Sequence, residues 1–300
     1  MQEHILDSCT LCPRTCRVNR SAGQLGYCRA GADLIAARAA LHHWEEPSIS
    51  GEKGSGTVFF SGCPLGCVYC QNHCIAAAKA GKEITVRRMA DIFLELEQQG
   101  ALNINLVTPT HFVPQIIHSL DLAKADGLRL PVIYNTGGYE RVETLRLLEG
   151  YVDVYLPDFK YISPSAARRY SNAPDYPDVV KSAIAEMFRQ TGKIRFDSDG
   201  IVRRGMIVRH LVLPGHTEDA KRIIKYLHSA YGDEIYLSIM NQYTPMPAAK
   251  SFPNLRRPTS QDEYESVIDF AISIGVENAY IQEGETAEES FIPEFNLEGL

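Results

Sequence analysis

The amino-acid sequence predicts an α/β protein, a partial (β/α) barrel of about six parallel βα units with a small N-terminal Cys-rich metal-binding segment. Three observations predict it. From Thr57 onward, short apolar runs alternate with helical patterns, which implies βαβ units and a parallel sheet. Polar residues follow the apolar runs directly, where barrels place functional groups. All eight cysteines fall within residues 9–74, which favours metal sites over a disulfide framework.

The expected elements follow one another in a regular order. In the first helix, apolar Met89, Ile92, Phe93 and Leu96 recur at i, i+3, i+4 and i+7, which predicts one buried face. The stretch 236–240 is nearly continuously apolar, as is typical of a strand covered on both faces. The expected strands are residues 57–61, 103–107, 132–135, 152–156, 206–213, 235–240 and 279–282, and the expected helices are 86–99, 113–125, 140–149, 177–190, 218–231 and 260–274.

Three zones are expected along the chain. Residues 1–50 form a Cys-rich metal-binding segment with little periodic structure, residues 55–285 form the barrel, and residues 286–300 form a C-terminal tail. The Gly-rich stretch 51–56 is interpreted as a linker between the first two zones.

Composition narrows the class of protein. The chain has 300 residues, of which 45% are hydrophobic and 22% charged, as in ordinary globular proteins. The net charge is −7 and there is no basic stretch, which argues against a nucleic-acid partner. No apolar run approaches the roughly 18 residues of a membrane span, and the N-terminus lacks a secretory pattern. Eight cysteines without a secretory signal point to a reducing cytoplasm.

Three cysteines sit inside eight residues directly after the first expected strand. Cys63, Cys67 and Cys70 have the spacing C-x3-C-x2-C. A cubane iron–sulfur cluster normally takes four thiolates, so three would leave one iron open to bind a small molecule. The alternative is half of a zinc site, but structural zinc sites usually take four ligands in C-x2–4-C pairs. The spacing therefore predicts a 4Fe–4S cluster.

A second group of cysteines lies near the N-terminus, at Cys9, Cys12, Cys16 and Cys28. Four thiolates can close a tetrahedral zinc site or hold a full cubane. A cluster could relay electrons toward the first one, whereas zinc would only fasten a segment too small to build its own core. Both readings stay open, with a structural site favoured. Cys74 belongs to neither group of cysteines, and we expect it to be an inert thiol in the core.

The cysteine triad and its setting closely resemble the radical S-adenosylmethionine (radical SAM) superfamily. Over about residues 5–285 the chain resembles an uncharacterised subfamily similar to pyruvate formate-lyase activating enzyme, with an N-terminal Cys-rich segment. The resemblance implies a 4Fe–4S cluster whose open iron binds S-adenosylmethionine. A reduced cluster then cleaves this cofactor into methionine and a 5′-deoxyadenosyl radical, which takes a hydrogen atom from the substrate. It also implies a flavodoxin- or ferredoxin-type reductant, and a glycyl radical enzyme is the leading substrate.

The resemblance also implies roles for residues at the strand ends. Tyr69 would stack near the adenine, or else make a hydrophobic contact under the loop. Asn135 and Thr136, in Tyr-Asn-Thr-Gly-Gly-Tyr, would line the cofactor pocket or cap a helix. Asp158 and Lys160 resemble the Asp-x-Lys element of glycyl-radical activating enzymes and are the expected catalytic pair that positions cofactor and substrate. The alternative for this pair is a surface ion pair of little energetic worth.

Two further strand ends carry weaker resemblances. Thr108 and Thr110, followed by His111, stand where the family often has a Gly-Gly-Glu element that touches the methionine amino group. This chain has no such element, so the threonines are expected either to supply oxygen contacts or to form a simple turn. In the strand at 206–213, His210 is the expected cofactor contact, with a purely structural histidine as the alternative.

Two other functions are open at this point. The first is a radical SAM enzyme that acts on a small metabolite or on another protein. The second is a non-enzymatic iron–sulfur electron carrier, against which the polar strand ends argue, since a carrier does not need them.

Overall fold

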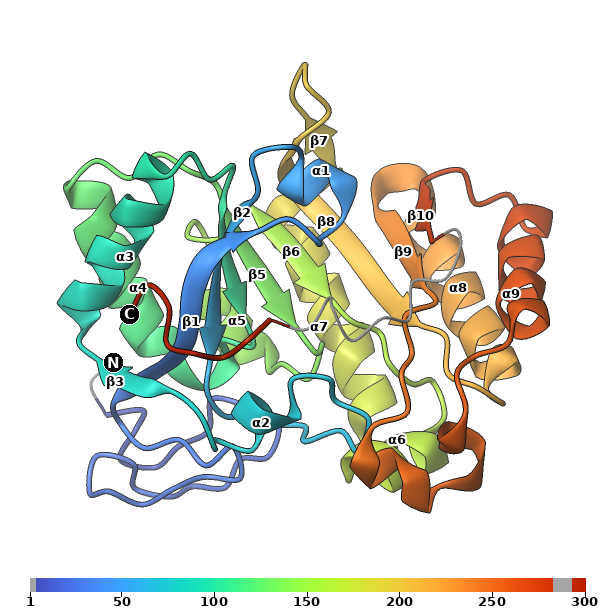
Figure 1. Ribbon diagram of the computed structural model, residues 1–300, viewed down its shortest axis with the longest axis horizontal. Helices are drawn as coiled ribbons and strands as arrows, with labels where there is room; N and C mark the ends of the chain where they lie inside the picture. The colour runs from blue at the N-terminus through green and yellow to red at the C-terminus, as the bar shows by residue number, and fades with distance from the viewer. Residues whose placement is uncertain (1–3, 283–292) are drawn as a thin grey trace.

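A computed structural model describes residues 4–282 and 293–300 (Figure 1). Its centre is one sheet in the order β10-β9-β8-β6-β5-β4-β2-β1-β3. All pairs from β2 to β10 are parallel, and β1 and β3 are added antiparallel at one edge. The parallel strands are β2 (Ser55–Phe60), β4 (Ile104–Val107), β5 (Val132–Thr136), β6 (Val154–Pro157), β8 (Val202–Leu211), β9 (Tyr236–Met240) and β10 (Ala279–Ile281).

At least one helix follows each parallel strand except β10, so the prediction of a partial barrel of about six βα units is confirmed. The helices are α1 (Pro47–Ser50), α2 (His73–Ala76), α3 (Val86–Gln98), α4 (Val113–Ala125), α5 (Val142–Leu147), α6 (Pro164–Ser171), α7 (Tyr176–Thr191), α8 (Thr217–Tyr231) and α9 (Gln261–Ser273), with 3-10 turns at Thr110–Phe112, Gly232–Glu234, Pro247–Ser251 and Pro253–Arg256. The expected helices correspond to α3, α4, α5, α7, α8 and α9, while the short helices α1, α2 and α6 were not expected.

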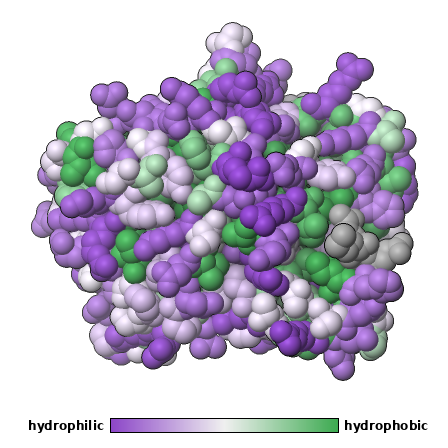
Figure 2. All heavy atoms as spheres, turned by 180° about the vertical axis from the view of Figure 1, so that it is seen from behind, coloured by the Kyte–Doolittle hydropathy of each residue, from purple (hydrophilic) through white to green (hydrophobic). Residues whose placement is uncertain are grey.

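Local chemistry explains where the helices begin and which side they bury. The Thr85 hydroxyl accepts from the Arg88 N–H at the start of α3, and Ser260 and Glu263 form a capping box at the start of α9. Met89 and Phe93 of α3 are fully buried, as their spacing predicts. Seen from behind, hydrophilic side chains predominate on the molecule's surface, with small apolar patches among them (Figure 2).

The N-terminal zone contains more regular structure than expected. Residues Leu34–His42 form β1, which pairs antiparallel with β2, and β1 also pairs with β3 (Lys82–Ile84). The linker interpretation of residues 51–56 is wrong, because the Gly51 N–H donates to the Pro47 carbonyl (3.0 Å) and Gly56 lies inside β2. A further two-residue strand, β7 (Arg195–Phe196), pairs with β8.

The C-terminal residues run along β1. The Ala39 N–H donates to the Glu298 carbonyl (2.8 Å), the Leu297 N–H donates to the Ala37 carbonyl (3.3 Å), and the Glu298 carboxylate pairs with Arg38 (2.7 Å). These contacts cover a strand edge that would otherwise present unpaired backbone groups. Residues 283–285 of the expected barrel zone and 286–292 of the expected tail lie outside the described residues, and the zone boundaries stay predictions. Among the described helices, none is long and apolar enough to cross a membrane.

Candidate active site

A cavity of about 650 Å³ lies at the end of the sheet where the parallel strands terminate. The structure gathers around it most of the residues that the sequence singled out at the strand ends. Those that line it are Cys63, Cys67, Tyr69, Cys70, Thr108, Thr110, Asn135, Thr136, Asp158 and Lys160. Residues from the loop after β2 and from the ends of β4, β5 and β6 therefore share one space, as the barrel prediction requires.

The loop after β2 holds its three cysteines at the cavity wall. Gly62 has φ +94°, and a Cβ there would come within 2.5 Å of the Cys28 carbonyl oxygen, so this turn requires glycine. The Ser171 hydroxyl donates to Cys67 Sγ (3.0 Å). Burial raises the pKa of Cys63 to about 11 and also raises that of Cys70. Thiolates at this wall therefore need a cationic partner, which the irons of a cluster would supply.

A cluster also suits the spacing of the thiols. Within residues 4–282 and 293–300, no three cysteine, histidine or acidic side chains are grouped so that they could hold one metal ion. A single zinc ion needs its ligands around one point, whereas the thiolates of a cubane bind different irons. The three thiols, which all line this cavity, match in number and place the ligand set of a 4Fe–4S cluster with one open iron.

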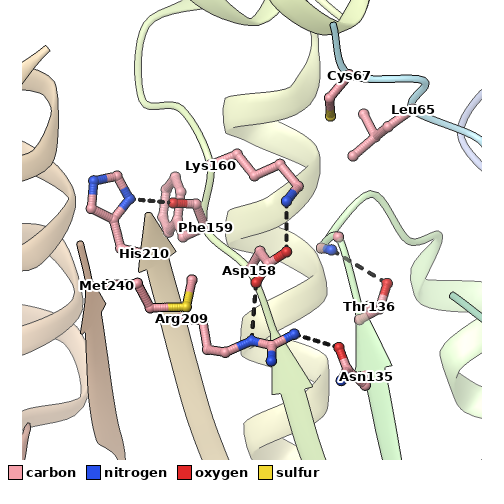
Figure 3. Close-up of polar contacts among 12 residues, drawn as sticks. Leu65, Cys67, Asn135, Thr136, Asp158, Phe159, Lys160, Arg209, His210 and Met240 are labelled. Carbon is pink, nitrogen blue, oxygen red and sulfur yellow. Dashed lines mark hydrogen bonds and ion pairs between the residues drawn. The ribbon is translucent and has the colours of Figure 1, made fainter. Parts of the chain in front are cut away.

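Asp158 is the centre of a polar network on the cavity floor (Figure 3). Lys160 Nζ donates to one carboxylate oxygen (2.6 Å), and Arg209 Nε donates to the other (3.2 Å). Arg209 also donates to the Asn135 side-chain oxygen (2.5 Å). The side chains of Lys160 and Asp158 are only 19% and 17% exposed, so the alternative of a surface ion pair is wrong.

Charges on this floor compensate one another. Burial raises the pKa of Asp158, but Lys160 and Arg209 outweigh burial and lower it overall. Burial lowers the pKa of Lys160, but the charges of Asp158 and Cys67 outweigh burial, so the pKa of Lys160 is raised overall. Lys160 therefore stays protonated between a carboxylate and the cysteine loop, where it can hold an anionic group of a ligand.

Three acidic residues that line the cavity, Glu45, Glu46 and Glu140, were missed by the sequence analysis. Glu45, ahead of α1, accepts from Arg209 Nη1 (3.0 Å) and from the Asn105 amide (3.0 Å). Glu140, after β5, accepts from the Thr110 hydroxyl (2.6 Å) and from the Thr136 hydroxyl. Burial raises the pKa of Glu140 to about 7. Glu140 could have been found from its place two residues after a Gly-Gly turn.

The threonine and tyrosine side chains that line the cavity differ in their contacts. Thr110 and Thr136 direct their hydroxyls to Glu140, so they reach the cavity as partners of that carboxylate. Thr108 has φ +57°, a strained conformation for a β-branched residue, and its N–H donates to the Asn135 carbonyl (2.8 Å). Tyr69 is buried with its ring edge-on to the rings of Tyr161 and Tyr243.

The expected cofactor contact from His210 needs correction. Neighbouring side chains of a strand point to opposite faces, and on β8 it is Arg209 that faces the cavity. The ring of His210 turns the other way, and its Nδ1 lies 2.7 Å from the Phe159 carbonyl oxygen (Figure 3). The carboxylates of Asp158 and Glu45 explain this choice, since they draw the guanidinium inward.

The N-terminal cysteines form a separate group behind the loop. Cys9, Cys12 and Cys28 are buried and Cys16 is exposed. A Cβ on Gly26 would lie 3.2 Å from Cys16 Sγ and 3.4 Å from Cys28 Sγ, so these two thiols flank one glycine. Buried Arg20 donates to Cys9 Sγ (3.7 Å) and to the His111 carbonyl (2.7 Å), which ties this group to the end of β4.

A family model confirms the superfamily that the cysteine spacing indicates. The model described as "Radical SAM superfamily" matches residues 57–227. The chain belongs to the radical SAM superfamily. This family uses a 4Fe–4S cluster and S-adenosylmethionine, so the chain is a radical SAM enzyme with these cofactors.

The individual relatives give less information about this chain than the family model does. The chain is 29% identical over 287 residues to the uncharacterized protein MJ0674 of Methanocaldococcus jannaschii, a match that covers 93% of this chain and 78% of that protein. It is also similar to Streptococcus suis SuiB bound to S-adenosylmethionine (12% identity, TM-score 0.49, 75% of this chain and 49% of that one) and to native anSMEcpe with bound AdoMet (13%, 0.49, 71% and 57%). The chain spans about half the length of these two structures, and likeness at this level carries no argument.

Proposed function

We propose that Cys63, Cys67 and Cys70 would hold the 4Fe–4S cluster and leave one of its irons open to S-adenosylmethionine. The observation that carries this assignment is that all three thiols line the same cavity as the Asp158–Lys160 pair. The bound cluster, reduced by a flavodoxin- or ferredoxin-type donor of the cytoplasm, would supply the electron that splits S-adenosylmethionine into methionine and a 5′-deoxyadenosyl radical.

The protein's own residues would bind and orient the cofactor. Lys160, protonated beside Asp158, would hold a carboxylate group, and Asn135, held in place by Arg209 and Glu45, would line the cofactor pocket. Tyr69, fixed between two other tyrosines, would offer a rigid apolar surface to the adenine. Enclosure of these groups in the cavity would exclude water from a reactive radical.

We further propose that the substrate is a glycine residue of a partner enzyme. The 5′-deoxyadenosyl radical would take a hydrogen atom from the glycine Cα, which leaves 5′-deoxyadenosine and a glycyl radical. The Asp158-x-Lys160 element and its place beside the cysteines support this substrate by resemblance to glycyl-radical activating enzymes.

The test is 5′-deoxyadenosine formation by the anaerobically reconstituted, dithionite-reduced protein. The proposal predicts turnover in the wild type and none in Cys67→Ala. A protein that holds its cluster but does not cleave S-adenosylmethionine would be an electron carrier instead. For the substrate, a glycyl radical EPR signal should appear in a glycyl radical enzyme mixed with the reduced protein and S-adenosylmethionine, and its absence with every such partner would exclude this substrate class.

A further inference from the structure

Among the described residues, one carboxylate of the cavity has neither an ion pair nor a hydrogen bond to each of its oxygens. Glu45 and Asp158 are matched by two cations, since Arg209 contacts both and Lys160 contacts Asp158. Glu46 also lines the cavity and is 8% exposed. Its Oε2 atom is buried and makes no hydrogen bond within the described parts of the chain. The Ser238 hydroxyl and the charge of Arg209 offset the burial of this carboxylate only in part. A buried carboxylate with an unbonded oxygen is costly to keep ionised, so its state depends on what enters the cavity.

The backbone role of Glu46 does not account for its side chain. Glu46 occupies the N-cap position of α1, where a side-chain oxygen commonly accepts from the first turn. Here no such side-chain bond forms, and the carboxylate extends toward the cavity. Burial raises the pKa of Glu46 in the absence of a ligand, although the charge of Arg209 works in the opposite direction.

Aromatic rings line the same cavity. Trp44 enters from the segment between β1 and α1, and Tyr280 enters from β10. The interaction between a cation and an aromatic face is attractive, and aromatic rings combined with a carboxylate are a recurrent way to bind organic cations. The cysteine loop lines another part of the wall. Lys160, on which the charge of Cys67 acts, pairs with Asp158. Arg209 then joins Asp158 to Glu45, so this row of charges separates the cysteine loop from the Glu45 side of the cavity.

We infer that the part of the cavity around Glu46 and Trp44 is a substrate subsite that binds an organic cation, an amine or a guanidinium group. Its role as a substrate subsite rests on the proposed function, in which the cofactor occupies the cysteine side of the cavity. For a protein substrate, the cation would be a lysine or arginine side chain near the residue that loses hydrogen. When it binds, Glu46 gains an ion-pair partner, which it lacks among the described residues.

The chain offers its own reporter for the test. Trp44 is its single tryptophan and lines the cavity. The full-length protein, reconstituted with its cluster and saturated with S-adenosylmethionine, is titrated with n-butylguanidinium and with the neutral n-butylurea while tryptophan fluorescence is recorded. The wild type should bind the cation at least tenfold more tightly than the urea. Glu46→Gln should lose most of this preference, whereas Glu52→Gln, an exposed acid nearby, should retain it.

Glu46→Gln keeps the size of the side chain and resembles the protonated acid, so it should fold, and Glu46→Asp keeps the charge as a second check. Equal affinity for the two probes in the wild type, or an unchanged preference in Glu46→Gln, would overturn the inference. Binding of the cation only when S-adenosylmethionine is absent would also overturn it, because the subsite would then belong to the cofactor. Formation of 5′-deoxyadenosine by the wild-type preparation tests the proposed function separately, so failure of either is recognised by itself.

Discussion

The two groups of cysteines use the same ligand chemistry in opposite settings. Cys63, Cys67 and Cys70 lie on the wall of a cavity of about 650 Å³ that also holds charged and aromatic side chains. The N-terminal group is packed behind that wall, with three of its four thiols buried. The contrast teaches that thiol count and spacing predict a metal site, whereas only the fold shows which thiols line a ligand-sized cavity.

The two groups are also physically joined. Arg14, between Cys12 and Cys16, donates to the Pro64 carbonyl in the cysteine loop (2.9 Å) and to the Ser171 carbonyl (2.9 Å). The Cys28 carbonyl lies against Gly62. A metal in the N-terminal segment would therefore hold the back of the loop in place, and a redox-active one would stand next to it.

The largest effect is expected from removing ligands of the N-terminal group. Cys12→Ser combined with Cys16→Ser should eliminate the metal bound by that segment and lower the melting temperature, because metal binding to a small segment contributes its folding energy. Iron, zinc and sulfide analysis checks the stoichiometry. Metal content equal to that of the wild type would show that these cysteines do not form a site.

Glu140 bears on both groups, since it lines the cavity of the first and its charge raises the pKa of buried Cys12 in the second. Burial raises the pKa of Glu140 itself from 4.5 to about 7 in the folded protein. The unfolded chain therefore releases this proton more readily, and the free energy of unfolding should fall as pH rises from about 4.5 to about 7, on the order of 3 kcal/mol from this group.

Glu140→Gln removes this contribution. Urea unfolding of both proteins at several pH values between 5 and 8 measures it, with the difference between them as the readout. We expect Glu140→Gln to gain stability relative to the wild type as pH rises through the window. A difference that is independent of pH would mean that Glu140 does not hold its proton in the folded state.

Lys160→Met tests the cavity side of the comparison. Loss of the charge that holds a ligand carboxylate should reduce 5′-deoxyadenosine formation about a hundredfold, as expected for misplacement of a reacting group by about 1 Å. Asp158 keeps Arg209 as a partner, so the variant should stay folded. Lys181→Met, on α7, is a control that should leave turnover unchanged. Normal turnover by Lys160→Met would assign the pair a purely structural role.

The smallest effect is expected at the contact between the two groups. Arg14→Ala removes donors from the Pro64 and Ser171 carbonyls and should lower the free energy of unfolding by about 1–2 kcal/mol. Arg14→Lys keeps the charge without the planar fork and should recover only part of this. Equal stability of all three proteins in chemical denaturation would show that the contact does not fasten the segment.

The sequence predicted the parallel strands and most helices because their apolar patterns are local. It missed β1, an alanine-rich strand whose burial depends on pairing with β2, and α6, whose sequence PSAARRYS has too few large apolar side chains for a clear period. The sequence analysis placed Asp158 and Lys160 at the site, and both line the cavity. It favoured His210 over Arg209, because alternation along a strand does not tell which face is inward. Glu45 and Glu46 could not be predicted as site residues from the sequence, since only the tertiary fold brings residues ahead of α1 to the barrel interior.

The central claim is that the cysteines on the cavity wall, and not those of the N-terminal group, hold the cluster with an open iron. EPR of the reduced protein with and without S-adenosylmethionine tests it most directly. The spectrum should change on addition of the cofactor in the wild type and in Cys12→Ser/Cys16→Ser, and this change should be lost when Cys63, Cys67 and Cys70 are all replaced by Ala. Persistence of the cofactor-dependent change in the triple variant would contradict the account.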